Sequence, residues 1–520
     1  QIKFDIKKFQ IYLSTYNPLV NYQNINIPIK EINIYSKIIP LIKSKIEINQ
    51  INFLIENFDI NKIQTAASRI KPSNLKTYLL NNLKKGDVTS FFGHIGFDNN
   101  YKITDYKFNG NVEKVNLQFR DSHIIEDLKL NFVADKNLVL LNSISANYKN
   151  LKITNGSIEV ENKEEIFIKG KLDSELAFNE KDIFNFTKDS FFEENKLNGK
   201  GNLVHDFNFN LDSSYKLTTY NYAISGNIED SQINLKKNLK SQFLEKSIKN
   251  ILFSNTKIEA KINNQNKNTL YLEGLYSTKD NNFKKFKIDG VLNKDAQKYN
   301  VDLDLQESIL IKFLNFKSNK KINANIKSEF RIDDKNINFK SIIFNDTNNL
   351  ITINGLLLNS RYEIKNLSNI TVVTYKDKKE NNNFKINIKD KIIIGGKQFD
   401  STNLLKLLNS KSDKNILKNF TKEIEINLQN IITKSNISIN NFRLIGNIEK
   451  GKFSKLSAKS EFSEEKFLDI SLKKDSTNRK ILEIYSDIPK ALLTDYKFFE
   501  GIKEGKLFYN SVIDGDISVS

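Results

Sequence analysis

The chain has 520 residues, of which 39% are hydrophobic, so it is long enough for several domains or for one elongated repeat structure. Lysine and arginine total 80 against 62 acidic residues, but this excess is spread along the chain instead of gathered in a patch, which argues against nucleic-acid binding. The chain has no cysteine, which excludes disulfides, thiolate metal sites and cysteine nucleophiles.

Both ends of the sequence suggest that it is part of a longer protein. It opens on Gln1, contains no methionine and stops in mid-pattern at GDISVS. No run approaches the roughly 18 to 20 apolar residues of a membrane-spanning helix, and no signal peptide is visible. We therefore expect any membrane anchor to lie outside this excerpt.

Apolar and polar residues alternate in short runs along the whole chain, which is typical of strands with one buried face. Turns rich in Asn, Asp, Lys and Gly separate the runs, and only five prolines interrupt them. The pattern predicts a mostly β fold of antiparallel meanders, without βαβ units. The residues expected to line its apolar face are Val115, Leu117, Phe119, Leu128, Leu130, Phe132, Val301, Leu303, Leu305, Ile326, Phe330, Phe384, Ile386, Ile388, Ile424, Ile426 and Leu428.

Helical patterns are few and short. One helix is expected to begin at Pro72 and Ser73 and to end at Gly86, and a second is possible over residues 182–192. The stretch IIIGGKQFDSTNLLKLLNSK, residues 392–411, predicts a strand, a Gly-Gly turn and a short helix capped by Asp400 with Ser401 or Thr402. Such a helix is not stable alone, so Leu404, Leu405 and Leu408 are expected to dock on the apolar face.

A loose repeat accompanies the strands. A glycine with an apolar residue two positions away on each side recurs at irregular intervals, so each glycine shares a face with two apolar side chains. It either leaves a notch in that face, permits a bend, or marks an ordinary hairpin turn. The glycines are Gly110, Gly170, Gly226, Gly290, Gly355, Gly446 and Gly515.

No pattern in the sequence points to a catalytic, metal or cofactor site. His94, His123 and His205 are isolated in sequence and are expected at the surface or in turns. The Gly395-Gly396 pair lacks the G-x-x-x-x-G-K-[ST] spacing that wraps a phosphate. We expect a protein that is not an enzyme and that works without cofactors.

These patterns suggest a division into five parts. They are an N-terminal segment, a helix with a re-entry turn, central β repeats, the strand-turn-helix join and a C-terminal segment. Their expected bounds are 1–66, 67–90, 91–391, 392–411 and 412–520.

Several stretches follow the order of elements in a known family. Residues 69–97, 108–119, 124–160 and 314–358 resemble the helix, Gly turn and successive strands of AsmA-like proteins related to YhdP. Residues 392–408 resemble that family's join, and 485–519 resemble the lead-in to its C-terminal region. The likeness is one of pattern and order across nearly the whole chain, and no single motif is diagnostic.

The resemblance implies a monomeric, taco-like β-groove in the Gram-negative periplasm. Such a groove carries phospholipid between the inner and outer membranes by contact with acyl chains, and regions outside this excerpt contact the membranes. Strands with one apolar face are consistent with a groove, because few helices are predicted to cover that face. Two alternatives remain open: a structural or adhesive β-solenoid or sandwich without a groove, and an enzyme on a β scaffold.

Overall fold

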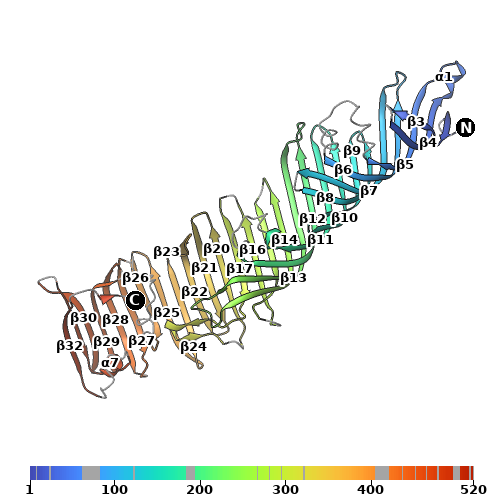
Figure 1. The fold of residues 1–520 in the computed structure, drawn as a ribbon. Helices are drawn as coiled ribbons and strands as arrows, with labels where there is room; N and C mark the ends of the chain where they lie inside the picture. Colours follow the sequence, from blue (N-terminus) through green and yellow to red (C-terminus); the bar gives the residue numbers. More distant parts are fainter. Residues whose placement is uncertain are drawn as a thin grey trace. The chain divides into compact units, whose positions relative to one another are not determined.

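The computed structural model describes most of the chain, in two units (Figure 1). Unit 1 comprises residues 1–233 and 253–271, and unit 2 comprises 234–252 and 272–520. Both are mostly β, with open, largely antiparallel sheet and few short helices, which confirms the predicted fold class. The described residues are 1–6, 9–22, 25–60, 82–120, 123–182, 194–265, 267–279, 282–293, 295–319, 322–403, 421–435, 437–450, 452–463, 465–476, 479–495, 504–513 and 517–518.

Unit 1 is an antiparallel meander in which β4 to β12 pair in chain order. Strands β13 to β15 contribute residues to both units. The elements are β1 (Ile2–Asp5), β2 (Gln10–Tyr16), β3 (Leu19–Tyr22), β4 (Ile25–Lys37), α1 (Ile38–Ile42), β5 (Ile48–Asp59), β6 (Leu83–Phe97), β7 (Ile103–Arg120), β8 (His123–Asp135), β9 (Leu138–Tyr148), β10 (Leu151–Asn162), β11 (Ile166–Asn179), β12 (Lys196–Leu211), β13 (Leu217–Leu239), β14 (Ile248–Asn263) and β15 (Asn268–Ser277).

Unit 2 continues the same pattern, and here β17 pairs directly with β20. Its elements are β16 (Lys284–Leu292), β17 (Gln297–Asp304), β18 (Leu310–Ile311), the 3₁₀ turn η1 (Lys312–Leu314), β19 (Phe316–Lys317), β20 (Ala324–Ile332), β21 (Asn336–Asp346), β22 (Asn349–Asn359), β23 (Ile364–Asn366), β24 (Asn369–Lys376), β25 (Lys379–Ile388), β26 (Lys391–Asp400), β27 (Lys422–Ile432), β28 (Ser438–Glu449), β29 (Lys452–Ser463), β30 (Lys466–Lys474), β31 (Lys480–Ser486), α7 (Lys490–Leu493), β32 (Leu507–Ile513) and β33 (Ile517–Ser518).

The strand register places the apolar residues of unit 1 on one face. Phe108 lies opposite Ala134 and Gly93, and Phe132 lies opposite Gly110 and Leu141. Since cross-strand partners project to the same side, this apolar face extends from strand to strand. No named element in the described part of unit 1 covers it, because the strands lie within the sheet and α1 lies at the β4–β5 turn.

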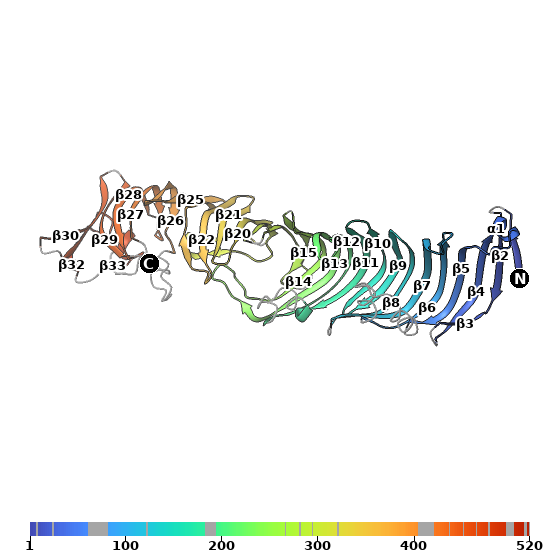
Figure 2. The same cartoon turned by 90° about the horizontal axis from the view of Figure 1, so that it is seen from above.

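A row of backbone irregularities bends the strands of unit 1. Asn57, Lys114, Asp127 and Ser143 have positive φ angles of 52°, 54°, 51° and 53°, and the register of β6 to β9 shifts next to them. Bulges bend a strand and increase its twist. The strands β5 to β12 accordingly follow a common curve (Figure 2).

Part of the apolar face of unit 1 is closely packed. Phe58 and Val88 are each 5% exposed and Val115 is 3% exposed, and the three pack together. Ile60, Leu83 and Leu128 also pack in this cluster.

Phenylalanine rings fill notches that glycines leave in this face. A Cβ added at Gly110 would meet the Phe132 ring at 3.0 Å, and one added at Gly170 would overlap the Phe207 ring. Both glycines are paired with these phenylalanines across neighbouring strands. Gly110 and Gly170 therefore leave notches in the apolar face, which is one of the three roles considered for the repeated glycines.

In unit 2 the prediction of a Gly-Gly turn at residues 395–396 is wrong. Both glycines lie inside β26, paired with β25 on one side and with β27 on the other. Strands β26 and β27 are parallel, an exception to the antiparallel meander that the sequence predicted. The two hydrogen-bonding neighbours keep the chain extended through the glycines.

The predicted helices fall mostly outside the described residues. Leu404, Leu405 and Leu408 lie there, as do most of the residues expected to form the helix beginning at Pro72. Gly86 does not end a helix, because β6 already begins at Leu83. The division between the units falls within the segment 91–391 that was predicted to form the central repeats.

The opposite face of the sheet carries paired charges. Lys129 Nζ lies 2.8 Å from Glu113 on the neighbouring strand, and Lys473 Nζ lies 2.8 Å from Glu483. Such exposed pairs contribute little to stability, because water and salt screen them. They show how part of the dispersed positive charge is balanced at the surface.

Candidate functional site

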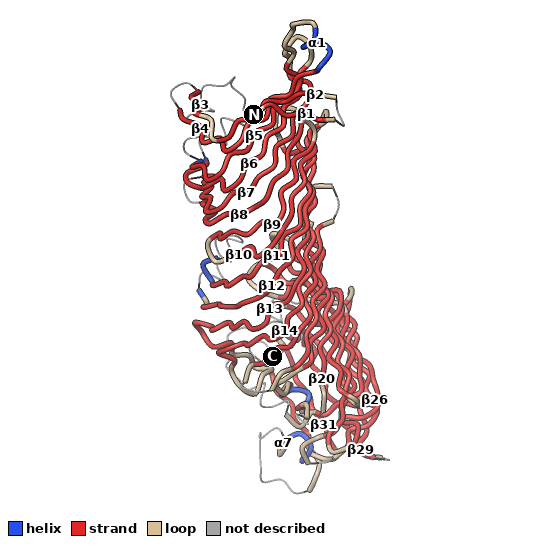
Figure 3. The backbone as a smooth tube through the Cα atoms, turned by 90° about the vertical axis from the view of Figure 1, so that its right-hand side faces the viewer, coloured by secondary structure: helices blue, strands red, loops and turns tan. Residues whose placement is uncertain are grey.

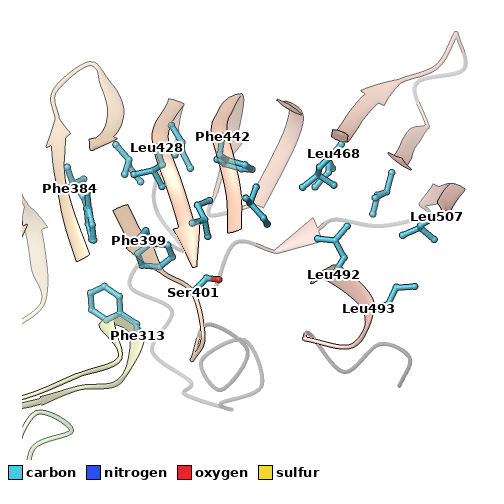
Figure 4. Close-up of a pocket in the computed structure, with 17 residues that line it drawn as sticks. Phe313, Phe384, Phe399, Ser401, Leu428, Phe442, Leu468, Leu492, Leu493 and Leu507 are labelled. Atoms are coloured by element: carbon cyan, nitrogen blue, oxygen red, sulfur yellow. The ribbon is translucent and has the colours of Figure 1, made fainter. Parts of the chain in front are cut away.

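Unit 2 contains a cavity of about 560 Å³ on the apolar face of its sheet (Figure 4). This volume lies within the range of roughly 300 to 1,000 Å³ that is usual for small-molecule sites. Strands β25 to β28 and β30 to β32 supply most of its described lining, and α7, η1 and Ser401, directly after β26, supply the rest. The lining residues are Phe313, Phe384, Ile386, Ile394, Phe399, Ser401, Ile426, Leu428, Ile431, Ile439, Phe442, Leu468, Ile470, Ile484, Leu492, Leu493 and Leu507.

The cavity lining is almost entirely hydrocarbon. Ser401 supplies its one polar side chain among the described residues, and the Ser401 Oγ donates a hydrogen bond to the Ile432 carbonyl oxygen at 2.9 Å. No described lining residue carries an ionisable group. The described part of this surface can bind an apolar ligand through burial and dispersion, and its side chains include no carboxylate, imidazole or amine.

A segment between two paired strands covers part of the apolar face. Residues 305–319, which we call the capping segment, leave the sheet after β17 and return before β20. Leu314 is 1% exposed and Phe316 is 2% exposed, and the Phe316 ring packs edge-on against Phe344 with centroids 5.7 Å apart. Phe313 of this segment lies near Phe384 and Phe399 in the cavity (Figure 4).

Buried amide groups hold the capping segment in place. Asn382 is fully buried and donates from Nδ2 to the Leu314 carbonyl oxygen at 2.7 Å. Asn315 Nδ2 donates to Asp400 Oδ2 at 2.8 Å, and the Asp400 backbone N–H donates to Asn382 Oδ1 at 3.0 Å. The carboxylate of Asp400, 3% exposed, also accepts from the Thr402 backbone N–H at 3.0 Å. These bonds satisfy polar groups that would otherwise be costly to bury.

Helix α7 closes another side of the cavity. Leu492 and Leu493 line it, and Ala491 of the same helix is fully buried in the core cluster of unit 2. The end of this helix is fixed because Asp495 Oδ2 accepts hydrogen bonds from the Ser435 backbone N–H at 2.9 Å and from its Oγ at 2.7 Å. The cavity is therefore bounded by elements that specific polar contacts position.

The structure brings four of the predicted face residues together in the cavity. Phe384, Ile386, Ile426 and Leu428 line it. Of the others in unit 2, Ile388 and Ile424 belong to an adjoining apolar cluster, and Leu305, the first residue of the capping segment, and Ile326 pack against the cluster that contains Leu314 and Phe316. The remaining three, Val301, Leu303 and Phe330, are half-buried on β17 and β20, where Leu303 lies opposite Ile326.

Five of the six predicted residues of unit 1 share its apolar face. Val115 lies opposite Leu128, and Leu117 lies opposite Ile125. Leu117, Leu128, Leu130 and Phe132 are half-buried, whereas Val115 is buried in a cluster with Phe58 and Val88. Phe119 belongs to β7, but its side chain lies outside what the structure describes.

The three histidines do not lie in turns, and His205 is not at the surface. His205 is 8% exposed in β12, where Nε2 lies 2.7 Å from Ser174 Oγ and Nδ1 lies 2.7 Å from Tyr222 Oη. Burial lowers the pKa of His205, against a smaller opposing effect of Asp173. Ser174 is 3% exposed and also donates to the Leu203 carbonyl oxygen, so the cluster satisfies itself within the apolar face.

Sequence reasoning missed several lining residues. Phe442, Ile470 and Ile484 lie in alternating runs like those that were singled out, so the same pattern could have found them. Phe313 and Leu492 had no such signal, because one comes from a 3₁₀ turn and the other from a single helical turn. Their place in the cavity depends on contacts between segments distant in sequence.

Other features of a site are absent from the described part of the chain. No three His, Asp or Glu side chains gather there as a metal site would require. Among the same residues, no helix has the length and apolar character needed to cross a bilayer. Comparisons with family models, curated proteins and solved structures found no match to this chain.

Proposed function

We propose that this chain is a non-enzymatic lipid conduit that holds phospholipid acyl chains on its apolar sheet faces and passes them between the two membranes of a Gram-negative envelope. The observation that carries the proposal is the hydrocarbon cavity of about 560 Å³ on the sheet of unit 2. The order of elements that resembles AsmA-like proteins supports the periplasmic location and the monomeric state.

The energetics of acyl chains favour such a surface. Moving one CH₂ group from water to an apolar environment is favourable by roughly 0.8 kcal/mol. Exposing an acyl chain of about 16 carbons to water therefore costs on the order of 12 kcal/mol. A face built from Phe, Ile and Leu side chains offsets most of that cost through burial alone. Transfer along such a face requires no bond making or breaking, which fits a lining without ionisable groups.

The apolar face of unit 1 supports the same function. Its half-buried side chains, such as Leu130 and Phe132, are not covered by a named element in the described residues. Apolar faces that stay open to solvent are often sites for a partner or ligand. In the proposal, acyl chains occupy this face while the polar headgroup remains in water.

Lipid analysis of the purified chain tests the proposal. The folded protein is extracted with organic solvent, and the extract is analysed by mass spectrometry for phospholipid. We expect co-purifying phospholipid in a stoichiometric amount. A folded sample that carries none would favour the structural β protein, in which the apolar faces pack only against protein.

A vesicle assay then separates binding from transfer. Fluorescent phospholipid in donor vesicles is followed as it reaches acceptor vesicles, with Ile470→Lys as the test variant and Ile445→Lys as its control. Ile470 lines the cavity, whereas Ile445 is 67% exposed on the other face of the sheet. We expect transfer to fall with Ile470→Lys alone, and equal rates for the two variants would contradict the conduit.

A further inference from the structure

The turn between β4 and β5 presents apolar side chains to solvent. Ile39 is 70% exposed, Ile42 is 78% exposed and Ile46 is 69% exposed, all within or just after α1. Tyr101, in the turn between β6 and β7, is 58% exposed. We call Ile39, Ile42, Ile46 and Tyr101 the tip patch. Figure 3 shows α1 at the end of the strands of unit 1.

Hydrogen bonds give the tip patch a fixed shape. Lys43 N–H and Lys45 N–H donate to the Pro40 carbonyl oxygen at 3.0 and 2.9 Å, which closes the turn after α1. Tyr101 Oη donates to the Ile46 carbonyl oxygen at 3.0 Å and so joins the two turns. An ordered turn loses little further conformational entropy when its apolar side chains become buried.

Basic residues surround the apolar side chains. Lys37, Lys43 and Lys45 are exposed in the sequence KIIPLIKSKIE of residues 37–47, and Glu47 is the one acidic residue of that stretch. Lys37 Nζ also donates to Asn99 Oδ1 of the second turn at 3.3 Å. Isoleucines at a tip with a rim of lysines are complementary to the surface of a bilayer that contains anionic lipids, because its headgroup region is negative and its interior is apolar.

We infer that the tip patch docks onto an anionic lipid bilayer surface, with Ile39 and Ile42 inserted below the headgroups and the lysines at the phosphate level. A surface that binds a protein partner typically has a broad apolar centre with a polar rim, whereas the tip patch consists of single side chains on projecting turns. This inference concerns a surface apart from the proposed acyl-chain sites and does not depend on them.

Co-sedimentation of the whole chain with vesicles tests the inference. Vesicles of phosphatidylcholine with about a third phosphatidylglycerol are compared with pure phosphatidylcholine vesicles, because surface potential scales with anionic lipid. We expect the wild type to bind the anionic vesicles at least tenfold more tightly and to lose that preference in high salt. Ile39→Ser with Ile42→Ser, and separately Lys43→Gln with Lys45→Gln, should each reduce binding to anionic vesicles at least fivefold.

Two controls keep the result specific. Ile445→Ser removes an equally exposed apolar side chain from unit 2 and should leave vesicle binding unchanged. Lipid extraction of the same tip variants is the second control, because it detects failure of the conduit separately from failure of the docking surface. Equal binding of the wild type and the tip variants, at the same melting temperature, would overturn the inference, as would binding that ignores anionic lipid.

Discussion

Asn382 Nδ2 donates a hydrogen bond to the carbonyl oxygen of Leu314, 2.7 Å away, and so joins β25 to the capping segment. The same amide donates to Thr374 Oγ1 at 2.9 Å, and its oxygen accepts from the Asp400 backbone N–H at 3.0 Å. One fully buried side chain thus connects two strands with the segment that covers part of the apolar face. The site depends on this contact because Phe313, next to Leu314, lines the cavity.

Replacing Asn382 with alanine should destabilise unit 2. Asn382→Ala leaves the Leu314 carbonyl and the Asp400 N–H without these partners, and we expect a loss of about 3 kcal/mol in the free energy of unfolding. Urea denaturation followed by circular dichroism measures it. Asn387→Ala, at an exposed position of the same strand, should cost less than about 0.5 kcal/mol. Similar losses for both variants would show that Asn382 does not hold the capping segment.

The adjacent glycines of β26 should respond differently to alanine. A Cβ at Gly396 would lie 2.5 Å from Phe384 Cα and 2.6 Å from its Cβ, whereas one at Gly395 would meet only the Asn427 oxygen at 3.8 Å. Gly396→Ala should therefore cost about 2 kcal/mol or more through overpacking. Gly395→Ala should be neutral or stabilising by up to about 1 kcal/mol. Thermal unfolding of the two variants checks this, and a reversed order would mean that β26 does not pair as described.

Because the chain has no cysteine, single thiols can report on the cavity. Phe442→Cys places a thiol in the lining, and Ile445→Cys places one on the exposed face of the same strand, β28. With an environment-sensitive fluorophore attached, the Phe442→Cys protein should change its emission when phospholipid is added. The label at position 445 should stay unchanged. Equal responses at both positions would indicate non-specific association of lipid with the protein.

Acidification should weaken unit 1 through His205. Burial holds its pKa below the ordinary value of 6.5, so the unfolded chain binds more protons than the folded one as pH falls below about 6.5. The folded state therefore loses no stability through His205 above about pH 6.5. As the pH falls from there toward the lowered pKa of His205, the free energy of unfolding decreases progressively. His205→Gln should lose less stability than the wild type between pH 7.5 and 5.5 in urea titrations. Parallel losses would show that His205 is not the titrating group.

The alternation of apolar and polar residues was sufficient to predict the mostly β fold. It also placed Leu128, Leu130 and Phe132 on one face, because side chains alternate across a strand whatever its partners are. The prediction that the histidines lie at the surface or in turns was wrong for His205. Its burial depends on Ser174 and Tyr222, which neighbouring strands bring to it.

What the sequence determined by itself was local: strand periodicity, the apolar character of one face, and the lack of a phosphate-binding motif at Gly395-Gly396. The tertiary structure decided the rest. It kept those glycines in mid-strand, since β25 and parallel β27 supply their hydrogen-bonding neighbours. It also decided which part of the apolar face is covered by the capping segment and which part lines a cavity, since those contacts join residues as far apart as Leu314 and Asn382. Periodicity constrains how a strand orients its side chains, but only packing between distant segments determines what lies against them.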